Sequence, residues 1–213
     1  QDKSKKKLAD LTVSDFSDET ASESPAPGGG SVSAYMGSLG AALGTMVANL
    51  SSHKRGWDDR WEEFSGWAEK GIALQSELTK LVDEDTEAFN KIIDAFRLPK
   101  KTEEEKQKRK EAIQDATKNA IMVPFRIMET ANNSLEVIKA MVEKGNPNSV
   151  TDAGVGALAV RSAVKGAFLN VRINSKDLDD KAFVDDIIKK GEKIEKDTEE
   201  QEKEILKLLE EKI

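Results

Sequence analysis

Apolar side chains recur along this chain at the spacing of helices. Between Trp57 and Phe96 they follow one another every three or four residues with no proline among them, which predicts one long helix or two helices in line. Leu98 and Pro99 end this segment, because the residue before a proline is pushed out of the helical region. The sequence has no run that alternates in the manner of a strand. The pattern therefore predicts an all-α protein.

Capping signals mark the start and the end of the next helix. Thr102 opens a T-x-x-E capping box with Glu105, and an apolar stripe then continues to Met141. The sequence Gly145-Asn146-Pro147 stops it, because glycine and proline together cannot continue a helix.

Two further segments are rich in small residues. The first runs from Ser31 to Leu50 without a charged side chain and could be mistaken for a membrane span. It is rich in alanine, glycine and serine rather than leucine, so a helix buried among other helices fits it better. A second small-residue helix should begin at Ser149, with Asp152 completing its capping box, and reach about Ile173.

A short amphipathic helix from Thr12 to Ala21 and a charged helix from near Leu178 complete the predicted elements. Together they predict a helical bundle of about six helices, with the two Gly/Ala-rich helices at its centre. A chain of 213 residues can bury one substantial core, so we expect a single domain over residues 1–213.

Composition narrows the chemistry that this bundle could perform. The chain has no cysteine and one histidine, His53, so disulfides and thiolate chemistry are excluded, and a zinc site or a Ser-His-Asp triad is disfavoured. The net charge of -7 comes from intermixed acidic and basic residues and leaves no basic face for nucleic acid. Acid–base chemistry is thus left to carboxylates, lysines or water, and a reducing cytoplasm is the expected location. Residues 1–7 lead into no apolar signal segment, so we expect a trimmed or excised start.

The segment Ser24–Ser31 is the most informative polar stretch, because Pro27 is followed by Gly28, Gly29 and Gly30. Three glycines before a helix free the backbone to point several N–H groups at one spot, where the helix dipole adds positive potential. A flexible linker is the alternative interpretation. We favour a binding site, because prolines stiffen one side and an uncharged helix begins on the other. A P-loop is excluded by the missing G-K-[ST] sequence.

Asp85 is the strongest candidate for acid–base chemistry. The apolar ladder of the long helix places it on the inward side, where a carboxylate is costly unless it is paired or used. Two roles are open: a catalytic carboxyl, and half of a buried ion pair with a lysine or arginine. Ser38, Thr45 and Asn49 form a polar stripe along the preceding helix that such a carboxylate could meet, although core hydroxyls bonded to the backbone would have the same spacing.

Other polar residues give weaker signals. A capping role explains Asp152 without catalysis, so it is the second candidate. Arg161 and Lys165 lie one turn apart, with Asn170 beyond them, and suggest a cationic ridge for an anionic ligand unless they are solvated surface. Arg109 is aligned with apolar positions of its helix and is expected to turn inward.

Four blocks of sequence follow one another along nearly the whole chain. They are Pro25-Ala26-Pro27-Gly28-Gly29-Gly30-Ser31 with Leu39-Gly40-Ala41-Ala42-Leu43-Gly44-Thr45-Met46-Val47, then Asp83-x-Asp85-x-x-Ala88-Phe89 with Arg97-Leu98-Pro99-Lys100, then Gly145-Asn146 with Asp152, and Gly166-Ala167-x-x-Asn170-Val171-x-Ile173-Asn174. In order and spacing these blocks resemble the cyclodeaminase family, best known as the C-terminal half of formiminotransferase-cyclodeaminase. The segment 51–61 and the last acidic helix depart from the family pattern.

The resemblance implies an all-α subunit that closes 5-formimino-tetrahydrofolate to 5,10-methenyl-tetrahydrofolate with loss of ammonia, a step of histidine degradation. It implies a homodimer or larger homo-oligomer, a mono- or polyglutamylated folate substrate, a glutamate formiminotransferase as partner, and no metal or other cofactor. Nucleic acid and membrane are not expected partners. Carried over residue by residue, it gives acid–base work to Asp85, with Asp152 second. Substrate binding falls to Pro27, Gly28, Gly29, Gly30, Ser31, Asn49, Asn146 and Asn170, with Lys100, Arg109, Arg161 and Lys165 as candidates for the glutamate tail.

Two other functions remain open at this point. A methenyl-tetrahydrofolate cyclohydrolase is the nearest, since related free-standing proteins look able to hydrate the same methenyl carbon and the same carboxylate could activate water. A non-catalytic helical scaffold is more distant, because a scaffold has no use for an inward carboxylate beside three glycines.

Overall fold

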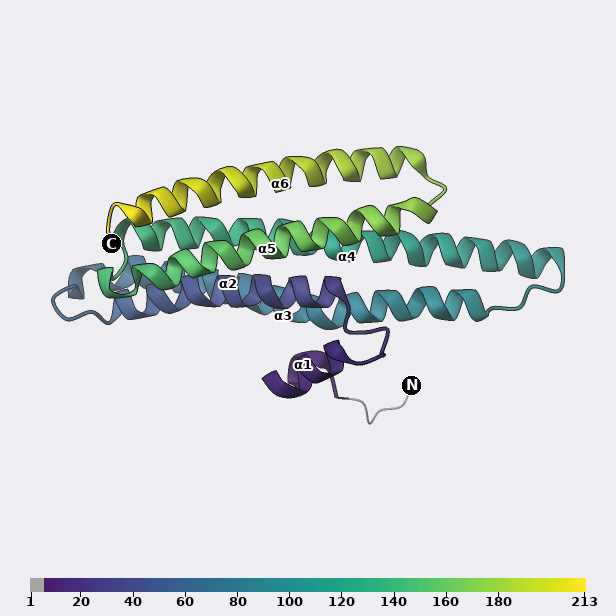
Figure 1. Ribbon diagram of the computed structural model, residues 1–213, viewed down its shortest axis with the longest axis horizontal. Helices are drawn as coiled ribbons and strands as arrows, with labels where there is room; N and C mark the ends of the chain where they lie inside the picture. Colours follow the sequence, from purple (N-terminus) through teal and green to yellow (C-terminus); the bar gives the residue numbers. More distant parts are fainter. Residues whose placement is uncertain (1–5) are drawn as a thin grey trace.

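Six α-helices form an elongated bundle in the computed structural model, which describes residues 6–213 (Figure 1). No strand occurs in that part of the chain, which confirms the predicted all-α fold. The interpretation of the first residues rests partly on residues 1–5, which lie outside the described range, and the single domain over 1–213 stays a prediction. The helices are α1 (Val13–Ala21), α2 (Gly29–Ser52), α3 (Trp61–Arg97), α4 (Glu103–Lys144), α5 (Val150–Asn174) and α6 (Lys181–Glu210).

The two Gly/Ala-rich helices, α2 and α5, pack directly on each other in antiparallel directions. Glycines allow this close approach: a Cβ atom on Gly40 would lie 2.9 Å from the carbonyl oxygen of Gly156, and one on Gly156 would lie 3.0 Å from the carbonyl oxygen of Gly40. The first distance is too short for a side chain and the second is at the limit, so the two glycines allow a closer approach of the helices than alanines would. The prediction that small-residue helices lie at the centre is confirmed.

Helices α3 and α4 form a long antiparallel hairpin that projects beyond the other helices (Figure 1). Their inward faces supply most of the large core side chains, including the fully buried Leu78, Ile127 and Met141. The predicted capping box is present at the start of α4: the Thr102 hydroxyl accepts from the Glu105 amide, and the Glu105 carboxylate accepts from the Thr102 amide.

Helix α6 covers α4 and α5 from the outside. It is amphipathic, with Ile187, Ile205 and Leu209 buried beneath a highly charged outer face. Polar contacts also hold it in place, among them the Asn132 amide, whose oxygen accepts from the Thr198 hydroxyl at 2.7 Å.

The predicted helix boundaries hold to within a few residues, but two details were wrong. Helix α2 begins at Gly29, so two of the three glycines form its first turn rather than a loop. Ser149 precedes α5 but makes no capping hydrogen bond through its side chain, because the residues before α5 already form a single helical turn, Pro147–Ser149. The capping box that accounted for Asp152 is therefore absent.

Candidate active site

Asp85 lies on α3 against the first turn of α2. The Ser31 hydroxyl lies 3.1 Å from Asp85 Oδ2, 2.9 Å from the Val82 carbonyl oxygen and 3.2 Å from the Thr86 hydroxyl. None of the described residues forms an ion pair with Asp85. The interpretation of Asp85 as half of a buried ion pair is therefore wrong, and hydrogen bonds hold this carboxyl instead.

The Ser31 hydroxyl can serve both protonation states of Asp85. A hydroxyl carries one proton and can accept two hydrogen bonds. When Asp85 is ionised, Ser31 can donate to its carboxylate. When Asp85 is protonated, it can donate to Ser31, which then donates to the Val82 carbonyl. The carboxyl can thus gain and lose a proton without leaving its place.

Gly30 brings the backbone of α2 onto the Asp85 carboxyl. A Cβ atom at this position would overlap Asp85 Oδ1, and both other carboxyl atoms would also be too close. Gly30 is helical and needs no left-handed conformation, so glycine is required here for space alone. The first-turn amides of α2, which carry partial positive charge, therefore lie beside the carboxyl.

Burial raises the pKa of the Asp85 carboxyl above its ordinary value, because removal from water disfavours the charged form. Hydrogen bonds from the Ser31 hydroxyl and the Ser31 backbone amide act in the opposite direction and lower the pKa. Burial is the larger effect, so the net shift is upward. A carboxyl with a raised pKa is better suited to exchange protons near neutral pH.

Asp85 opens into a cavity of about 210 Å³ between α2, α3, α4 and α5. Its lining combines polar groups, among them Asp85, Asn170 and the start of α2, with apolar side chains. The Asn174 amide closes the end of the cavity by donating to the Ala120 carbonyl oxygen at 2.8 Å. The lining residues are Pro25, Ala26, Gly28, Gly29, Gly30, Asp85, Thr86, Phe89, Ile92, Ala120, Asn170 and Asn174.

The structure brings five of the predicted site residues into this cavity: Gly28, Gly29, Gly30, Asp85 and Asn170. Two more adjoin it, since Ser31 contacts the Asp85 carboxyl and Pro27 is buried directly before Gly28. These seven residues come from three segments that are far apart in the sequence.

Three predicted residues lie at the opposite end of the bundle. The backbone N–H of Asn146 donates to the Ser51 hydroxyl at 2.8 Å, and Ser51 is twenty residues from Ser31, about 30 Å along α2. Asn49 lines a separate cavity beside His53. Asp152 is in the first turn of α5, at the same end.

Of the two interpretations of the polar stripe on α2, the structure supports core hydroxyls bonded to nearby groups rather than a contact with Asp85. Ser38 pairs with the Thr79 hydroxyl at 2.8 Å, and Thr45 donates to the Ala41 carbonyl oxygen. Because α2 and α3 are antiparallel, the residue that reaches Asp85 is Ser31 at the start of α2.

The four predicted tail-binding cations do not meet in one place. Arg161 pairs with Glu199 on α6 at 2.9 Å, and its Nη1 atom is buried without a hydrogen-bond partner in the described part of the chain. Lys165 is exposed on the same side, where its charge also acts on Glu199. These two cations face α6 rather than the Asp85 cavity.

Lys100 and Arg109 line a different groove, at the turn of the α3–α4 hairpin. Arg109 was expected to turn inward, but its guanidinium donates twice to the Phe96 carbonyl oxygen and lies over the Phe96 ring. Phe96 is eleven residues beyond Asp85, about 16 Å along α3.

Sequence reasoning missed Thr86, Phe89 and Ile92 as cavity residues. The spacing of Asp85, Phe89 and Ile92 could have indicated the last two, because residues three or four apart on a helix share a face. Thr86 directly follows Asp85 and is not indicated by this spacing. In residues 6–213 no group of three or more His, Cys, Asp or Glu side chains is arranged to hold a metal ion. No helix in this range is long and apolar enough to cross a membrane.

Comparison with known proteins adds a second line of evidence. A family model described as Formiminotransferase-cyclodeaminase matches residues 12–208. A methenyltetrahydrofolate cyclohydrolase from Methylorubrum extorquens is 38% identical over 181 residues, which cover 85% of this chain and 87% of that protein. A formimidoyltransferase-cyclodeaminase from Mus musculus is 36% identical over 176 residues, which cover 83% of this chain and 32% of that protein. The chain thus spans about a third of the mouse protein.

A solved structure agrees with the sequence comparisons. The crystal structure of formiminotetrahydrofolate cyclodeaminase from Thermotoga maritima matches with a TM-score of 0.84 at 28% identity. The match covers 95% of this chain and 98% of that one. The similarity therefore includes every helix that forms the Asp85 cavity.

Proposed function

This chain belongs to the formiminotransferase-cyclodeaminase family, and from that premise we propose that it closes 5-formimino-tetrahydrofolate to 5,10-methenyl-tetrahydrofolate with release of ammonia. A tetrahydrofolate stands in the names of the relative from Methylorubrum extorquens and of the solved structure from Thermotoga maritima. The observation that carries the choice of site is the Asp85 carboxyl, which has a raised pKa, opens into a cavity and is held by a hydroxyl that serves both of its protonation states.

The reaction needs one proton to move between two nitrogen atoms. N10 of the folate attacks the formimino carbon on N5 and gives a tetrahedral carbon that bears an amino group. N10 must lose its proton, and the amino group must gain one to leave as ammonia. The Asp85 carboxylate can accept the first proton and deliver it as the second. No further proton is consumed when the formimino group reacts as its formiminium cation, and the carbon keeps its oxidation state, so the proposed step needs no cofactor beyond the folate.

The remaining cavity residues would hold the substrate in place. The negative charge of Asp85 favours the cationic formiminium group, and the α2 amides can bind the polar edge of the pteridine ring. Phe89 and Ile92 form an apolar wall for the ring. Holding N10 against the formimino carbon makes the attack intramolecular and well oriented, which lowers its entropic cost.

Hydrolysis of the methenyl group is the second candidate, because the relative from Methylorubrum extorquens is a cyclohydrolase of similar length. Asp85 would then accept a proton from water as the water attacks the methenyl carbon. Both reactions use the same carbon atom between N5 and N10, so the same cavity could serve either.

An absorbance assay at the methenyl chromophore separates these reactions. One cuvette contains 5-formimino-tetrahydrofolate and the other contains 5,10-methenyl-tetrahydrofolate. Growth of the signal in the first is the expected result. Loss of the signal in the second, with no growth in the first, would assign the cyclohydrolase reaction instead. If the absorbance in both cuvettes changes at the same rate with and without the protein, the protein catalyses neither reaction, and the non-catalytic scaffold is the remaining interpretation.

Replacing Ser31 with alanine should move the acidic limb of the pH–rate profile to higher pH. The Ser31 hydroxyl lowers the pKa of Asp85, so its removal raises that pKa further and leaves less carboxylate at a given pH. The backbone amide of Ser31 remains, so activity should fall only severalfold near neutral pH and recover at higher pH. An unchanged profile would mean that Asp85 does not set the limb.

We also propose that the chain forms a homodimer through the outer face of α2. This helix has no charged residue, and its outward side chains recur at alternating steps of four and three. Three of them, Leu39, Met46 and Leu50, are 46%, 37% and 46% exposed. An uncharged stripe of this length is unusual for a monomer, and a two-fold axis could pair it with itself. The stripe consists of Val32, Met36, Leu39, Leu43, Met46 and Leu50.

Antiparallel pairing of the stripe would also explain why Asn49, Asn146 and Asp152, which were predicted as site residues, lie far from the Asp85 cavity of their own chain. A two-fold axis near the middle of α2 places the Asn49 end of one copy beside the Gly30 end of the other. Asn49, Asn146 and Asp152 of one protomer would then lie near the Asp85 cavity of its partner. The cavity of one chain holds about 210 Å³, less than the roughly 300–1,000 Å³ typical of sites for molecules of this size, so a second copy would help to enclose the folate.

The double substitution Leu39→Glu and Met46→Glu should convert the dimer to a monomer. Two carboxylates at the centre of an apolar interface should weaken association by about a hundredfold or more. Light scattering at micromolar concentration measures the effect, with Val13→Glu as the control, since Val13 is 72% exposed on α1. A monomeric wild type, or a double variant that stays dimeric, would contradict this interface.

We propose that a glutamate formiminotransferase is the partner enzyme that supplies the formimino-folate substrate. The names of several relatives join the two activities. This sequence of steps belongs to histidine degradation, and we place it in the cytoplasm, whose reducing conditions suit a cysteine-free chain.

A further inference from the structure

Pro124 lies in the middle of α4 and removes one hydrogen bond from that helix. In a regular helix, the amide of residue 124 would donate to the carbonyl oxygen of residue 120. Proline has no N–H, so the Ala120 carbonyl oxygen has no donor from its own helix. Ala120 and Pro124 are both buried, and a buried carbonyl oxygen without a partner is costly. A donor from another helix is therefore needed.

Asn174, the last residue of α5, supplies this donor. Its Nδ2 atom donates to the Ala120 carbonyl oxygen at 2.8 Å. Asn170, one turn earlier, is held in a similar way, since its Nδ2 atom donates to the Gly166 carbonyl oxygen at 3.0 Å. A carboxamide is planar, so a hydrogen bond at its nitrogen also restricts the direction of its oxygen. Both asparagine side chains line the Asp85 cavity with their direction fixed in this way.

The oxygen atoms of these two carboxamides are free to accept hydrogen bonds. Neither oxygen accepts one from residues 6–213. In the same range, Arg161 Nη1 is the sole buried side-chain nitrogen or oxygen without a partner, so the two oxygens are not buried. Because Asn170 and Asn174 line the cavity, these oxygens are available to a ligand that enters it.

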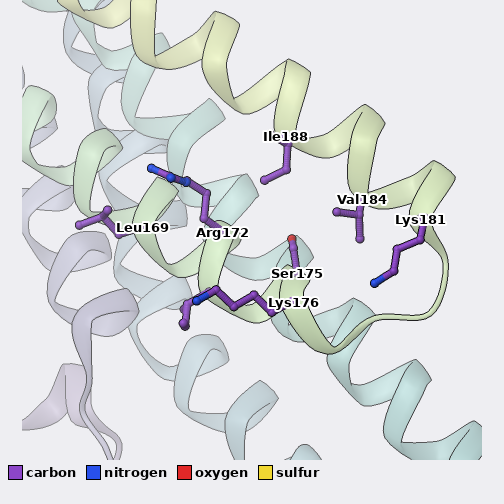
Figure 2. Close-up of a pocket in the computed structure, with 8 residues that line it drawn as sticks. Leu169, Arg172, Ser175, Lys176, Lys181, Val184 and Ile188 are labelled. Atoms are coloured by element: carbon purple, nitrogen blue, oxygen red, sulfur yellow. The ribbon is translucent and has the colours of Figure 1, made fainter.

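The end of α5 separates the Asp85 cavity from a second groove. Figure 2 shows Arg172 and Lys176 at this groove, which lies between α5 and α6. At 100° per residue, Arg172 lies about 160° around the helix axis from Asn174. Among the described residues, the groove and the cavity share no lining residue. Asn170 and Asn174 are thus the side chains that the end of α5 contributes to the cavity.

Hydrogen-bond donors and acceptors are separated within the cavity. Helix α2 begins at Gly29 and the antiparallel α5 ends at Asn174, so the amide end of one helix lies near the carbonyl end of the other. Partial positive charge at the start of α2 favours an acceptor on the ligand, and partial negative charge at the end of α5 favours a donor. Asn170 lies beside α2, because a Cβ atom on Gly29 would lie 3.2 Å from its Nδ2 atom. Asn174 is about 6 Å further along α5.

On the basis of the proposed function, we propose that Asn174 is a specificity residue that accepts a hydrogen bond from the 2-amino group of the pteridine ring. Pro124 is its positioning residue, because it leaves the Ala120 carbonyl free to hold the carboxamide. The 4-oxo oxygen of the ring lies beside N5, and the 2-amino group lies further along the same edge. With the formimino group on N5 at Asp85, the 4-oxo oxygen faces the α2 amides and the 2-amino group faces Asn174.

The test compares the affinity of the whole chain for tetrahydrofolate and for 2-desamino-2-methyl-tetrahydrofolate, by titration calorimetry. The wild type should bind tetrahydrofolate about tenfold more tightly, because the methyl group leaves the Asn174 oxygen without a partner. Asn174→Leu keeps the size of the side chain and should reduce this ratio to about one. Asn133→Leu, the same change at an exposed position of α4, should keep the ratio.

Pro124→Ala should reduce the ratio to about threefold and raise the melting temperature. The restored amide can donate to the Ala120 carbonyl, so α4 gains a hydrogen bond while Asn174 loses its fixed direction. Added to Asn174→Leu, Pro124→Ala should cause no further loss of the ratio, because both changes act through the same carboxamide. A role in stability alone would change the melting temperature and leave the ratio as it is.

Each other outcome overturns a distinct statement. If the wild type binds neither ligand and forms no methenyl-folate, the proposed function fails and the role of Asn174 fails with it. If it forms methenyl-folate but binds both ligands equally well, the role of Asn174 fails and the proposed function stands. If Asn174→Leu lowers the melting temperature but keeps the ratio, Asn174 only joins α5 to α4. If Pro124→Ala keeps the full ratio, Pro124 does not position Asn174. The wild-type comparison needs no variant, so it decides the role of Asn174 even if a variant fails to fold.

Discussion

Replacing Asp85 with asparagine should lower kcat by about a hundredfold or more, the usual scale for loss of a positioned acid or base. The amide keeps the size of the carboxyl and can still accept from the Ser31 hydroxyl, but it cannot carry a proton between N10 and the departing nitrogen. Affinity for tetrahydrofolate, which lacks the formiminium cation, should change little, because the cavity keeps its shape. Turnover is measured as formation of the methenyl chromophore at saturating formimino-folate.

The same substitution should raise the melting temperature. Because folding raises the pKa of Asp85, the contribution of this group to stability is fully present below its unfolded pKa and is lost as pH rises through the folded pKa. At neutral pH the wild type therefore holds a partly desolvated charge that asparagine lacks. The difference in melting temperature between variant and wild type should grow as pH rises from acid and then become constant.

Glu87→Gln is the control for this experiment. Glu87 is exposed two residues further along α3, and its substitution removes one negative charge, as Asp85→Asn does. It should leave both turnover and melting temperature nearly unchanged. A stable Asp85→Asn protein with full turnover would exclude Asp85 from the chemistry. Asp152 would then be the remaining candidate for the catalytic carboxyl, since no capping box explains its position.

Gly30→Ala should reduce turnover by roughly tenfold to a hundredfold, the second-largest effect expected on turnover. The new methyl group would occupy the place of the Asp85 carboxyl, which must rotate away from Ser31. A displacement of about 1 Å is enough to disturb a reacting geometry to this extent. The helix itself should tolerate the change, because alanine is a better helix former than glycine. Activity and helicity should therefore respond in opposite directions.

Gly66→Ala provides the matched control, because Gly66 lies within α3 and a Cβ atom there would meet nothing within 4 Å. This change should stabilise the protein by about 0.5–1 kcal/mol and leave turnover intact. If Gly30→Ala kept full activity, the contact between α2 and the carboxyl would be irrelevant to the reaction.

Most of the fold could be predicted from the sequence, because its signals are local. The capping box at Thr102, the stop at Gly145-Asn146-Pro147 and the helical spacing of apolar residues each act over a few positions. The Ser149 cap failed because a short helical turn before α5 competes for the same backbone. Capping residues in sequence do not specify which of two adjoining turns they will cap.

The candidate site was predictable only in part, because it depends on how helices align. The inward position of Asp85 follows from periodicity on one helix, and that prediction is confirmed. Its partner could not be predicted this way, because the antiparallel register of α2 and α3 decides whether Ser31, Ser38 or Asn49 reaches Asp85. The cations could not be assigned from sequence for the same reason. The spacing of Arg161 and Lys165 suggested an anion-binding ridge, but the packing of α6 places Glu199 against Arg161.

The central claim, that the Asp85 carboxyl moves the proton of the reaction, is tested most directly by comparing two titrations. One is the pH dependence of kcat/KM for methenyl formation, and the other is the titration of the Asp85 carboxyl followed by carbon-13 NMR in the free protein. We predict that activity falls as pH falls through one midpoint, that the carboxyl titrates at the same midpoint, and that this pKa lies above the ordinary range for aspartate. An Asp85 carboxyl that titrates while kcat/KM stays constant would contradict the account.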